Sequence, residues 1–174
     1  MPAVVALLRA VNVGGRKVPM ADLRDAVESL GFVDVRTYIQ SGNVLFSAPR
    51  VPKPDALEHA IVDRFGISVD VVIRSAADLR RALERDPFPD VDHSKLHVGF
   101  MAEKPVASAL SAIDRDAFLP DQFAVAGREL YLYLPNGMAR TKLPGHLLRR
   151  LDVPTTIRNW NTVTKLAELA RTSP

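Results

Sequence analysis

Four short polar segments of the 174-residue chain carry the residue types that bind ligands. The first reads Asn-Val-Gly-Gly-Arg-Lys and spans residues 12–17. Its two glycines permit backbone twists that aim N–H groups at a phosphate, and Lys17 adds positive charge. It is not a Walker loop, because no Gly-Lys-Ser/Thr follows. A strand-to-helix turn that needs positive φ explains the same glycines, so both interpretations stay open.

The second segment, Gln-Ser-Gly-Asn at residues 40–43, forms the tip of a predicted hairpin. Gly42 and Asn43 are sufficient for the turn, whereas Gln40 and Ser41 add polar groups that a turn does not require. Ser41 lacks the Gly-x-Ser-x-Gly elbow and the nearby histidine that a nucleophile needs. We therefore interpret this segment as a turn that also forms the rim of a binding site.

The third segment, Arg-Asn-Trp-Asn at residues 158–161, contains the one tryptophan of the sequence. Trp160 would stack on a base or a sugar while the neighbouring asparagines hydrogen-bond its edges. Alternatively, Trp160 packs in the core and Asn161 or Thr162 caps a last helix.

The fourth segment is a cluster of basic residues between positions 140 and 150, which contains Lys142 and His146. Residues 136–174 carry 7 basic and 2 acidic side chains, or +5, although the whole chain carries only +3. Helical spacing places the cluster opposite Leu143, Leu147 and Leu151, either as a solvated helix side or as a phosphate-binding surface.

Arg9 and several acidic residues outside these four segments also have side chains that could bind a ligand or a metal. Arg9 interrupts an apolar run and predicts either a structural ion pair across the interface between the two halves or a ligand contact, because an unpaired buried guanidinium is costly. We expect no metal site, since Asp90, Asp92 and His93 match no known ligand spacing, and no cofactor. The candidate ligand-binding residues are Arg9, Asn12, Gly14, Gly15, Lys17, Gln40, Ser41, Asn43, Asn136, Lys142, Arg158, Asn159 and Trp160.

The hydrophobic pattern predicts the elements that position these residues. Apolar alternation indicates strands, and apolar residues at i, i+4 and i+8 indicate helices. In the first half, the pattern predicts strands at 3–11, 35–40, 44–47 and 67–74, with helices at 19–30 and 54–65. A helix at 75–85 follows, with a capping box formed by Ser75 and Asp78, and then a proline-rich connector. In the second half, the pattern predicts strands at 95–102, 122–126, 129–134 and 155–160, with helices at 105–113, at 143–151 and at the C-terminus.

This order is β-α-β-β-α-β twice, so we predict an α+β protein with two ferredoxin-like subdomains and antiparallel sheets. The predicted boundaries are 1–74 for the first subdomain, 75–94 for a linker helix and connector, and 95–174 for the second subdomain with its C-terminal helix. Right-handed crossovers bring the first two polar segments to one end of the first sheet. The same rule places the segments that follow the last two strands of the second half, at Asn136 and Asn159, at one end of the second sheet.

Composition narrows the class of protein. With 47% hydrophobic and 25% charged residues, the chain reads as an ordinary globular protein. It has no run of about 20 apolar residues for a membrane span and no recognisable signal peptide. Zero cysteines exclude disulfides, thiolate metal sites and cysteine nucleophiles. We expect a cytoplasmic protein that does not associate with membranes.

Six sequence stretches, in order, resemble one bacterial family, domain of unknown function 1697. They are RAVNVGG, KVPMADLR, LGFVDVRTYIQSGNVLF, LYLPNG, TKL and RNWNTVTKL, and the likeness runs from about residue 4 to residue 169. The resemblance implies two ferredoxin-like α+β subdomains. It implies no activity and no catalytic residue.

Three function classes follow from these residues. The favoured hypothesis is a binding module for a phosphate-bearing small molecule or a nucleic acid, although the aromatic strand motifs of RNA-binding sheets are missing. The second hypothesis is an enzyme with an active-site cleft between the subdomains. Against it, the sequence shows no paired acid/base or nucleophile–base constellation. The third is a structural or protein-partner role. The sequence leaves the catalytic residues, the partner and the oligomeric state open.

Overall fold

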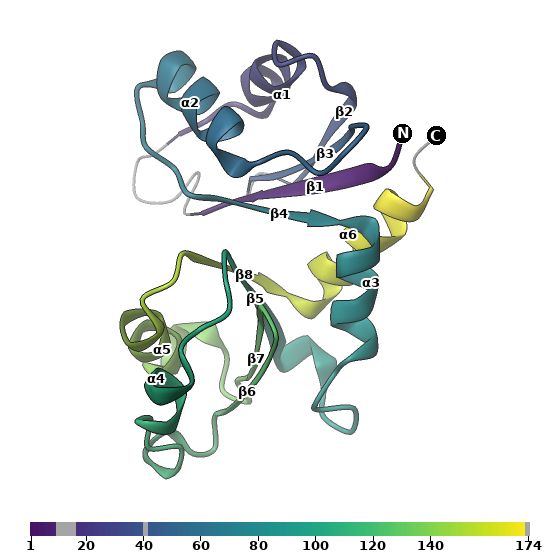
Figure 1. Cartoon of the computed structure of the whole chain (residues 1–174). Coiled ribbons are helices and arrows are strands. Elements are labelled where there is room, and N and C mark those ends of the chain that lie inside the picture. The colour runs from purple at the N-terminus through teal and green to yellow at the C-terminus, as the bar shows by residue number, and fades with distance from the viewer. Residues whose placement is uncertain (10–16, 40–41, 173–174) are drawn as a thin grey trace. The chain divides into compact units, whose positions relative to one another are not determined.

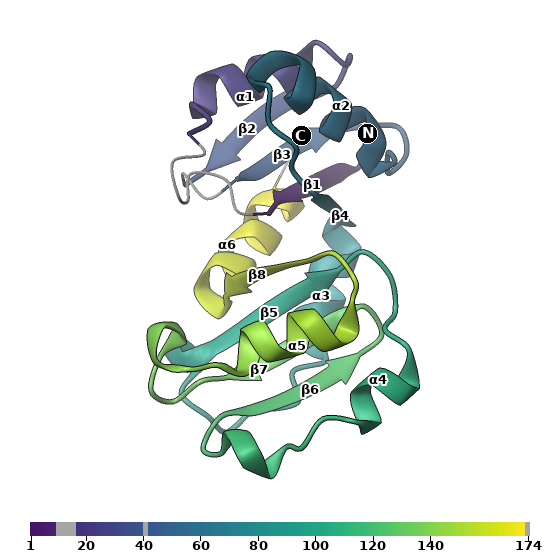
Figure 2. The ribbon, with the colours of Figure 1, turned by 90° about the vertical axis from the view of Figure 1, so that its left-hand side faces the viewer.

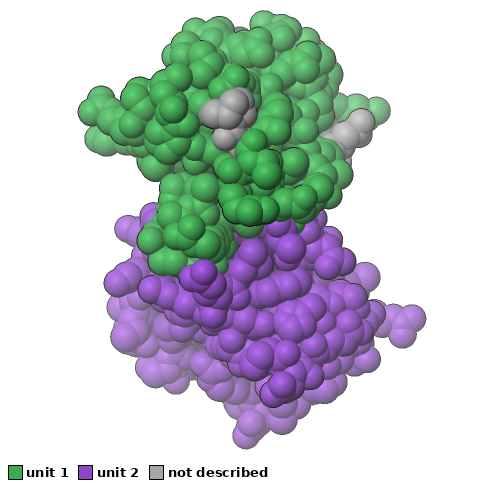
Figure 3. Space-filling model, turned by 90° about the vertical axis from the view of Figure 1, so that its right-hand side faces the viewer, with its two compact units in different colours: residues 1–81, 165–174 green, residues 82–164 purple. Residues whose placement is uncertain are grey.

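The computed structural model of the chain describes residues 1–9, 17–39 and 42–172. These residues form two compact units, one made of residues 1–81 with 165–174 and the other of residues 82–164 (Figure 3). Each unit contains a four-stranded antiparallel sheet with two helices on one face (Figure 1). The prediction of an α+β protein with two β-α-β-β-α-β units is therefore confirmed.

The first unit has the strand order β2-β3-β1-β4. Its elements are β1 (Ala3–Leu8), α1 (Met20–Glu28), β2 (Val33–Tyr38), β3 (Asn43–Ser47), α2 (Pro54–Phe65) and β4 (Val71–Ser75), followed by the start of α3 (Ala76–Glu84). Strand β1 pairs antiparallel with both β3 and β4, and β2 pairs antiparallel with β3, so β1 and β2 run parallel. The predicted strand at 67–74 begins only at Val71, although Ile67 and Val69 still pack on the core.

Local sequence explains where the helices of this unit begin and end. Helix α2 starts with Pro54, whose fixed φ suits the first turn, and ends at Gly66, which takes the left-handed conformation with φ 67°. The predicted capping box at the start of α3 is confirmed. The hydroxyl of Ser75 accepts from the Asp78 N–H at 3.1 Å, and the Asp78 carboxylate accepts from the Ser75 N–H at 2.9 Å.

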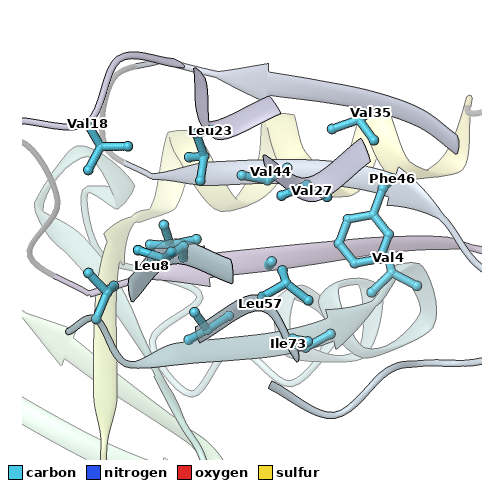
Figure 4. Packing of buried hydrophobic residues seen from close by; sticks show 14 of the residues in the cluster. Val4, Leu8, Val18, Leu23, Val27, Val35, Val44, Phe46, Leu57 and Ile73 are labelled. Atoms are coloured by element: carbon cyan, nitrogen blue, oxygen red, sulfur yellow. The ribbon is translucent and has the colours of Figure 1, made fainter. Parts of the chain in front are cut away.

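The hydrophobic core of the first unit lies between the sheet and helices α1 and α2 (Figure 4). Val4 and Leu8 of β1 meet Leu23 of α1 and Leu57 of α2 there, and all four side chains are buried. Every residue of β1 is buried, including those on the opposite face of the strand. Both faces of β1 are therefore covered, as in strands that read as continuous apolar runs, whereas the edge strand β2 is partly exposed.

The second unit repeats the topology, with the strand order β6-β7-β5-β8. Its elements are β5 (Leu96–Met101), α4 (Ala107–Ser111), β6 (Gln122–Ala126), β7 (Glu129–Tyr133), α5 (Leu143–Leu151) and β8 (Thr155–Asn159), followed by α6 (Trp160–Arg171). Short 3-10 turns occur at His93–Lys95, Asp116–Phe118 and Met138–Arg140. Figure 2 shows α5 lying across one face of this sheet, where Leu143, Leu147 and Leu151 enter the core as predicted.

The compact units differ from the predicted subdomains at two places. The first unit extends through Arg81, and it also includes residues 165–174, which we had assigned to the second subdomain. Within this unit, the Arg36 guanidinium of β2 donates to the Leu169 carbonyl of α6 at 3.2 Å. The predicted subdomain boundaries, 1–74, 75–94 and 95–174, stay a prediction. Among the described residues, none of the helices combines the length and the apolar character that a bilayer crossing requires.

Candidate functional site

The flanks of the first two polar segments are neighbours at one end of the first sheet. The Leu8 N–H at the end of β1 donates to the Gly42 carbonyl at 2.8 Å, and the Arg9 N–H donates to the Asp70 carbonyl at 3.0 Å. The predicted site residues Asn12, Gly14, Gly15, Gln40 and Ser41 lie outside the described residues. Arg9, Lys17 and Asn43 therefore define what the structure describes of this candidate site.

Asn43 has a structural role at the base of the hairpin. Its side chain is fully buried, and its Nδ2 donates to the Tyr38 carbonyl at 3.0 Å. The turn also places Ile39 at φ 50° and Gly42 at φ 78°. Gly42 is the residue type that adopts this conformation without strain. The Asn43 side chain thus closes the base of the hairpin by bonding to the backbone of β2.

Arg9 is exposed, so the prediction of a buried guanidinium is wrong. Strand β1 ends at Leu8, which places Arg9 one residue beyond the buried run. Its guanidinium lies 3.4 Å from the Asp70 carboxylate, and the two side chains are 44% and 51% exposed. An ion pair at that exposure contributes little stability. Arg9 and the exposed Lys17 are thus two solvent-accessible cations at this end of the sheet.

The third segment begins at the end of β8, and the side chains of its first two residues, Arg158 and Asn159, bond to the protein itself. Arg158 is 8% exposed, and its Nη1 donates to the Thr156 hydroxyl at 2.5 Å and to the Ile157 carbonyl at 3.1 Å. Burial lowers the pKa of Arg158 to about 10. The Asn159 Oδ1 accepts from the Thr162 N–H at 2.8 Å and so caps α6. The prediction that Asn161 or Thr162 caps this helix is wrong, because the last strand residue already serves as the cap.

Trp160 is half-buried at the start of α6 and packs against another ring of its own unit. Its ring centroid lies 5.0 Å from that of His93. The Nε2 of His93 lies 2.6 Å from an Asp86 carboxylate oxygen, which anchors the connector beneath the indole. Trp160 thus packs on a neighbouring ring without joining the hydrophobic core of the second unit, and its predicted role in stacking on a ligand stays a prediction.

The basic cluster remains on the surface of the second unit. Arg140, Lys142, Arg149 and Arg150 are exposed, and within the described chain none of the four forms a salt bridge with a carboxylate. His146 differs, because it is half-buried with its ring centroid 4.9 Å from that of Phe118. Asn136 is exposed in the turn after β7.

The described residues contain no group of three or more histidine, cysteine, aspartate and glutamate side chains that would hold a metal ion. One histidine nevertheless has an unusual environment. The Nδ1 of His97, on β5, is buried without a hydrogen-bond partner. Burial lowers the pKa of His97, and a hydrogen bond with the Lys95 backbone, which raises this pKa, only partly offsets the effect. A buried imidazole whose Nδ1 has no hydrogen-bond partner does not by itself form a catalytic constellation.

Sequence reasoning missed the most deeply buried cation of the first unit. Arg74 on β4 is 1% exposed and donates to the Ile73 carbonyl at 3.1 Å. In the sequence, Ile67, Val69, Val71 and Ile73 alternate with polar residues, which is typical of a half-buried strand with Arg74 on its solvated face. The continuous apolar run at residues 3–8 was the available signal, because it indicates a sheet buried on both faces.

Comparison with known proteins supports the fold and supplies no activity. The solved structure of the conserved bacterial protein SP0830 from Streptococcus pneumoniae superposes with a TM-score of 0.78 at 22% sequence identity, covering 99% of each chain. No curated protein matches the chain. A family model described as "Protein of unknown function (DUF1697)" matches residues 1–131. The chain therefore belongs to this family of proteins of unknown function.

Proposed function

We propose that the protein is a nucleic-acid-binding module. The contact with the phosphate backbone is made by the exposed side of residues 138–151, which comprise the 3-10 turn at Met138–Arg140 and helix α5. One observation carries the proposal: Arg140, Lys142, Arg149 and Arg150 are exposed without a salt bridge to any described carboxylate. The second unit carries as many acidic as basic side chains, yet residues 136–151 contain no acidic residue at all. The positive charge is therefore concentrated on one element.

The geometry of the segment favours an extended polyanion over a small phosphate ligand. Lys142 and Arg149 are separated by seven residues, or roughly 10 Å along a helix axis. Charges so spaced on the outer side of a helix suit the repeated phosphates of a nucleic-acid strand. A single phosphate is usually held by converging donors in a concave site, which this helix side does not provide. The apolar side of α5 anchors the charges, because Leu143, Leu147 and Leu151 are fixed in the core.

The test is fluorescence anisotropy of labelled single-stranded RNA, single-stranded DNA and duplex DNA with the full-length protein at several salt concentrations. Each phosphate contact contributes about 0.7 to 0.9 to the slope of log K against log salt. Arg149→Ala/Arg150→Ala is expected to weaken binding and to reduce this slope by up to about 2. The matched control, Arg24→Ala/Lys104→Ala, removes two exposed cations elsewhere and should leave both quantities nearly unchanged.

Two results would contradict the proposal. One is equal loss of affinity in the two double variants, which would indicate attraction to overall charge. The other is the absence of any salt-sensitive nucleic-acid binding, combined with salt-tolerant binding of inorganic phosphate. That second result would support a small phosphate-bearing ligand instead.

A further inference from the structure

A pocket of about 540 Å³ lies beside the loop that joins β3 to α2 in the first unit. Its lining includes Phe32, Ala48, Arg50, Val51, Pro52 and Lys53. The volume falls within the usual range of small-molecule sites, about 300 to 1,000 Å³. No residue of the basic segment 138–151 takes part, so the pocket is independent of the function proposed above.

The floor of the pocket is aromatic and fixed in place. The ring of Phe32 stacks on that of Phe46 with the centroids 4.5 Å apart and the planes 24° apart. Phe46 is 2% exposed and belongs to the core of the unit. Because the core holds the ring of Phe32, a ligand that packs on it does not have to order it first.

The loop itself is restrained by its sequence. Pro49, Pro52 and Pro54 occur within six residues, and each fixes its own φ. Ala48, the first residue after β3, is 1% exposed and anchors the start of the loop. Pro54 begins α2 and anchors the other end. The pocket is therefore largely preformed.

The rim of the pocket is positively charged. Arg50 and Lys53 are exposed, and neither forms a salt bridge within the described chain. The pocket lining contains no carboxylate. Lys53 is also the N-cap residue of α2 and makes no side-chain capping bond, so it leaves the positive end of the helix dipole at the rim. Two acidic residues lie two positions from the lining along the chain, Asp34 after Phe32 and Asp55 after Lys53; both are exposed, and neither is part of the lining.

We propose that this pocket binds a small aromatic anion, in which a ring system carries a carboxylate, sulfonate or phosphate group. The ring packs against Phe32, Val51 and Pro52, and the charged group lies toward Arg50 and Lys53. An apolar floor with a few charged groups at one side is the usual composition of a small-molecule site. We expect the ligand to be an anion because the two cations at the rim, Arg50 and Lys53, have no carboxylate partners.

The first experiment is a titration of the full-length ¹⁵N-labelled protein with 1-naphthalenesulfonate, followed by two-dimensional NMR. We expect saturable shifts at the backbone amides of Phe32, Arg50, Val51 and Lys53. A second titration uses 1-naphthalenemethanol, which has the same ring system without the charge. It should bind the same residues at least fivefold more weakly.

Two variants and one matched control make the test specific. Val51→Trp places an indole in the pocket and should abolish the sulfonate shifts at Phe32 and Lys53. Val62→Trp adds the same side chain on the exposed side of α2, and its starting exposure of 42% is close to the 47% of Val51. The Val62→Trp control should leave the affinity for 1-naphthalenesulfonate unchanged. Arg50→Ala/Lys53→Ala should weaken binding of the sulfonate at least fivefold without changing that of the alcohol.

The proposal is overturned if Val51→Trp binds the sulfonate as well as the natural protein does. It is also overturned if the shifts map to residues outside the pocket, or if the sulfonate and the alcohol bind equally. The Val62→Trp control shows whether an added surface indole alone alters the protein.

Discussion

Arg74 and Arg158 occupy the same position in the two sheets. Arg74 pairs with Val5, the third residue of β1, and Arg158 pairs with Val98, the third residue of β5. Each guanidinium donates through Nη1 to the carbonyl of the preceding isoleucine at 3.1 Å. The next residue in each case, Ser75 or Asn159, caps a helix by accepting from the N–H three positions on. The strand–helix segments β4–α3 and β8–α6 are therefore an internal repeat at the level of single residues.

Replacing either arginine should destabilise the protein in a way that depends on the shape of the new side chain. Arg74→Ala and Arg158→Ala leave a void and are each expected to cost about 2–4 kcal/mol of unfolding free energy. Arg74→Met and Arg158→Met fill much of that volume without a charge and should cost clearly less. Urea denaturation at pH 7 measures all four. Arg64→Ala, whose side chain is 48% exposed, is the control and should change stability by less than about 1 kcal/mol. Equal losses for Ala and Met would mean that the hydrogen bonds, rather than the packing, hold these positions.

The two helix caps should contribute similar stability. Ser75→Ala removes the hydroxyl that accepts from Asp78, and Asn159→Ala removes the oxygen that accepts from Thr162. Each is expected to lower the unfolding free energy by about 1 kcal/mol, because an N–H at the helix start loses its acceptor. Thermal unfolding followed by circular dichroism provides the measurement. Asn161→Ala tests the sequence-based alternative, and a loss as large as that of Asn159→Ala would argue against the assigned cap.

Tyr131 should stabilise the second unit through its hydroxyl. This group donates to the Ala82 carbonyl at 2.5 Å in a buried environment. Tyr131→Phe keeps the ring and leaves the carbonyl without this donor, which is expected to cost about 1–2 kcal/mol. Tyr133→Phe, two residues further along β7 and only half-buried, serves as the comparison in the same urea titration. A loss for Tyr133→Phe equal to that for Tyr131→Phe would show that the Ala82 bond is not responsible.

His97 should make stability fall in mild acid. Its folded-state pKa is lowered by burial, whereas the unfolded chain has an ordinary pKa near 6.5. Below pH 6.5 the unfolded state therefore binds a proton that the folded state refuses, and the unfolding free energy decreases with decreasing pH until the folded-state pKa is reached. Unfolding free energies of His97→Gln between pH 7.5 and 5 should depend less on pH than those of the natural protein. His59→Gln, on the exposed side of α2, should keep the natural dependence. An unchanged slope in His97→Gln would contradict this assignment.

Local patterns predicted the order of the elements because alternation, helical spacing and capping depend on residues close together in the sequence. The Ser75–Asp78 capping box is an example, since all its atoms come from four consecutive residues. The burial of Arg74 depends instead on what covers the second face of the first sheet, which no local pattern specifies. Arg9 shows the effect of a small boundary error. One residue decides whether a side chain belongs to a buried strand or to the surface.

The fold was confirmed, whereas the candidate site residues stay a prediction. Polar residues at the ends of strands were expected to bind ligands, but Asn43, Arg158 and Asn159 hydrogen-bond to the protein's own backbone or side chains. The same residue types close hairpins and cap helices, so residue type alone does not distinguish the two uses. The pocket beside Phe32 had no sequence signal, because a proline-rich loop with two cations reads as an ordinary surface connection.

The discontinuous first unit has a consequence for how the chain is made. Residues 165–172 belong to the same compact unit as β1, yet they leave the ribosome more than eighty residues after β4 does. The first sheet can therefore form early in synthesis, but the bond from Arg36 to the Leu169 carbonyl forms only after residue 169 has left the ribosome. A nascent chain stalled before residue 165 would carry a first unit that still lacks one of its segments.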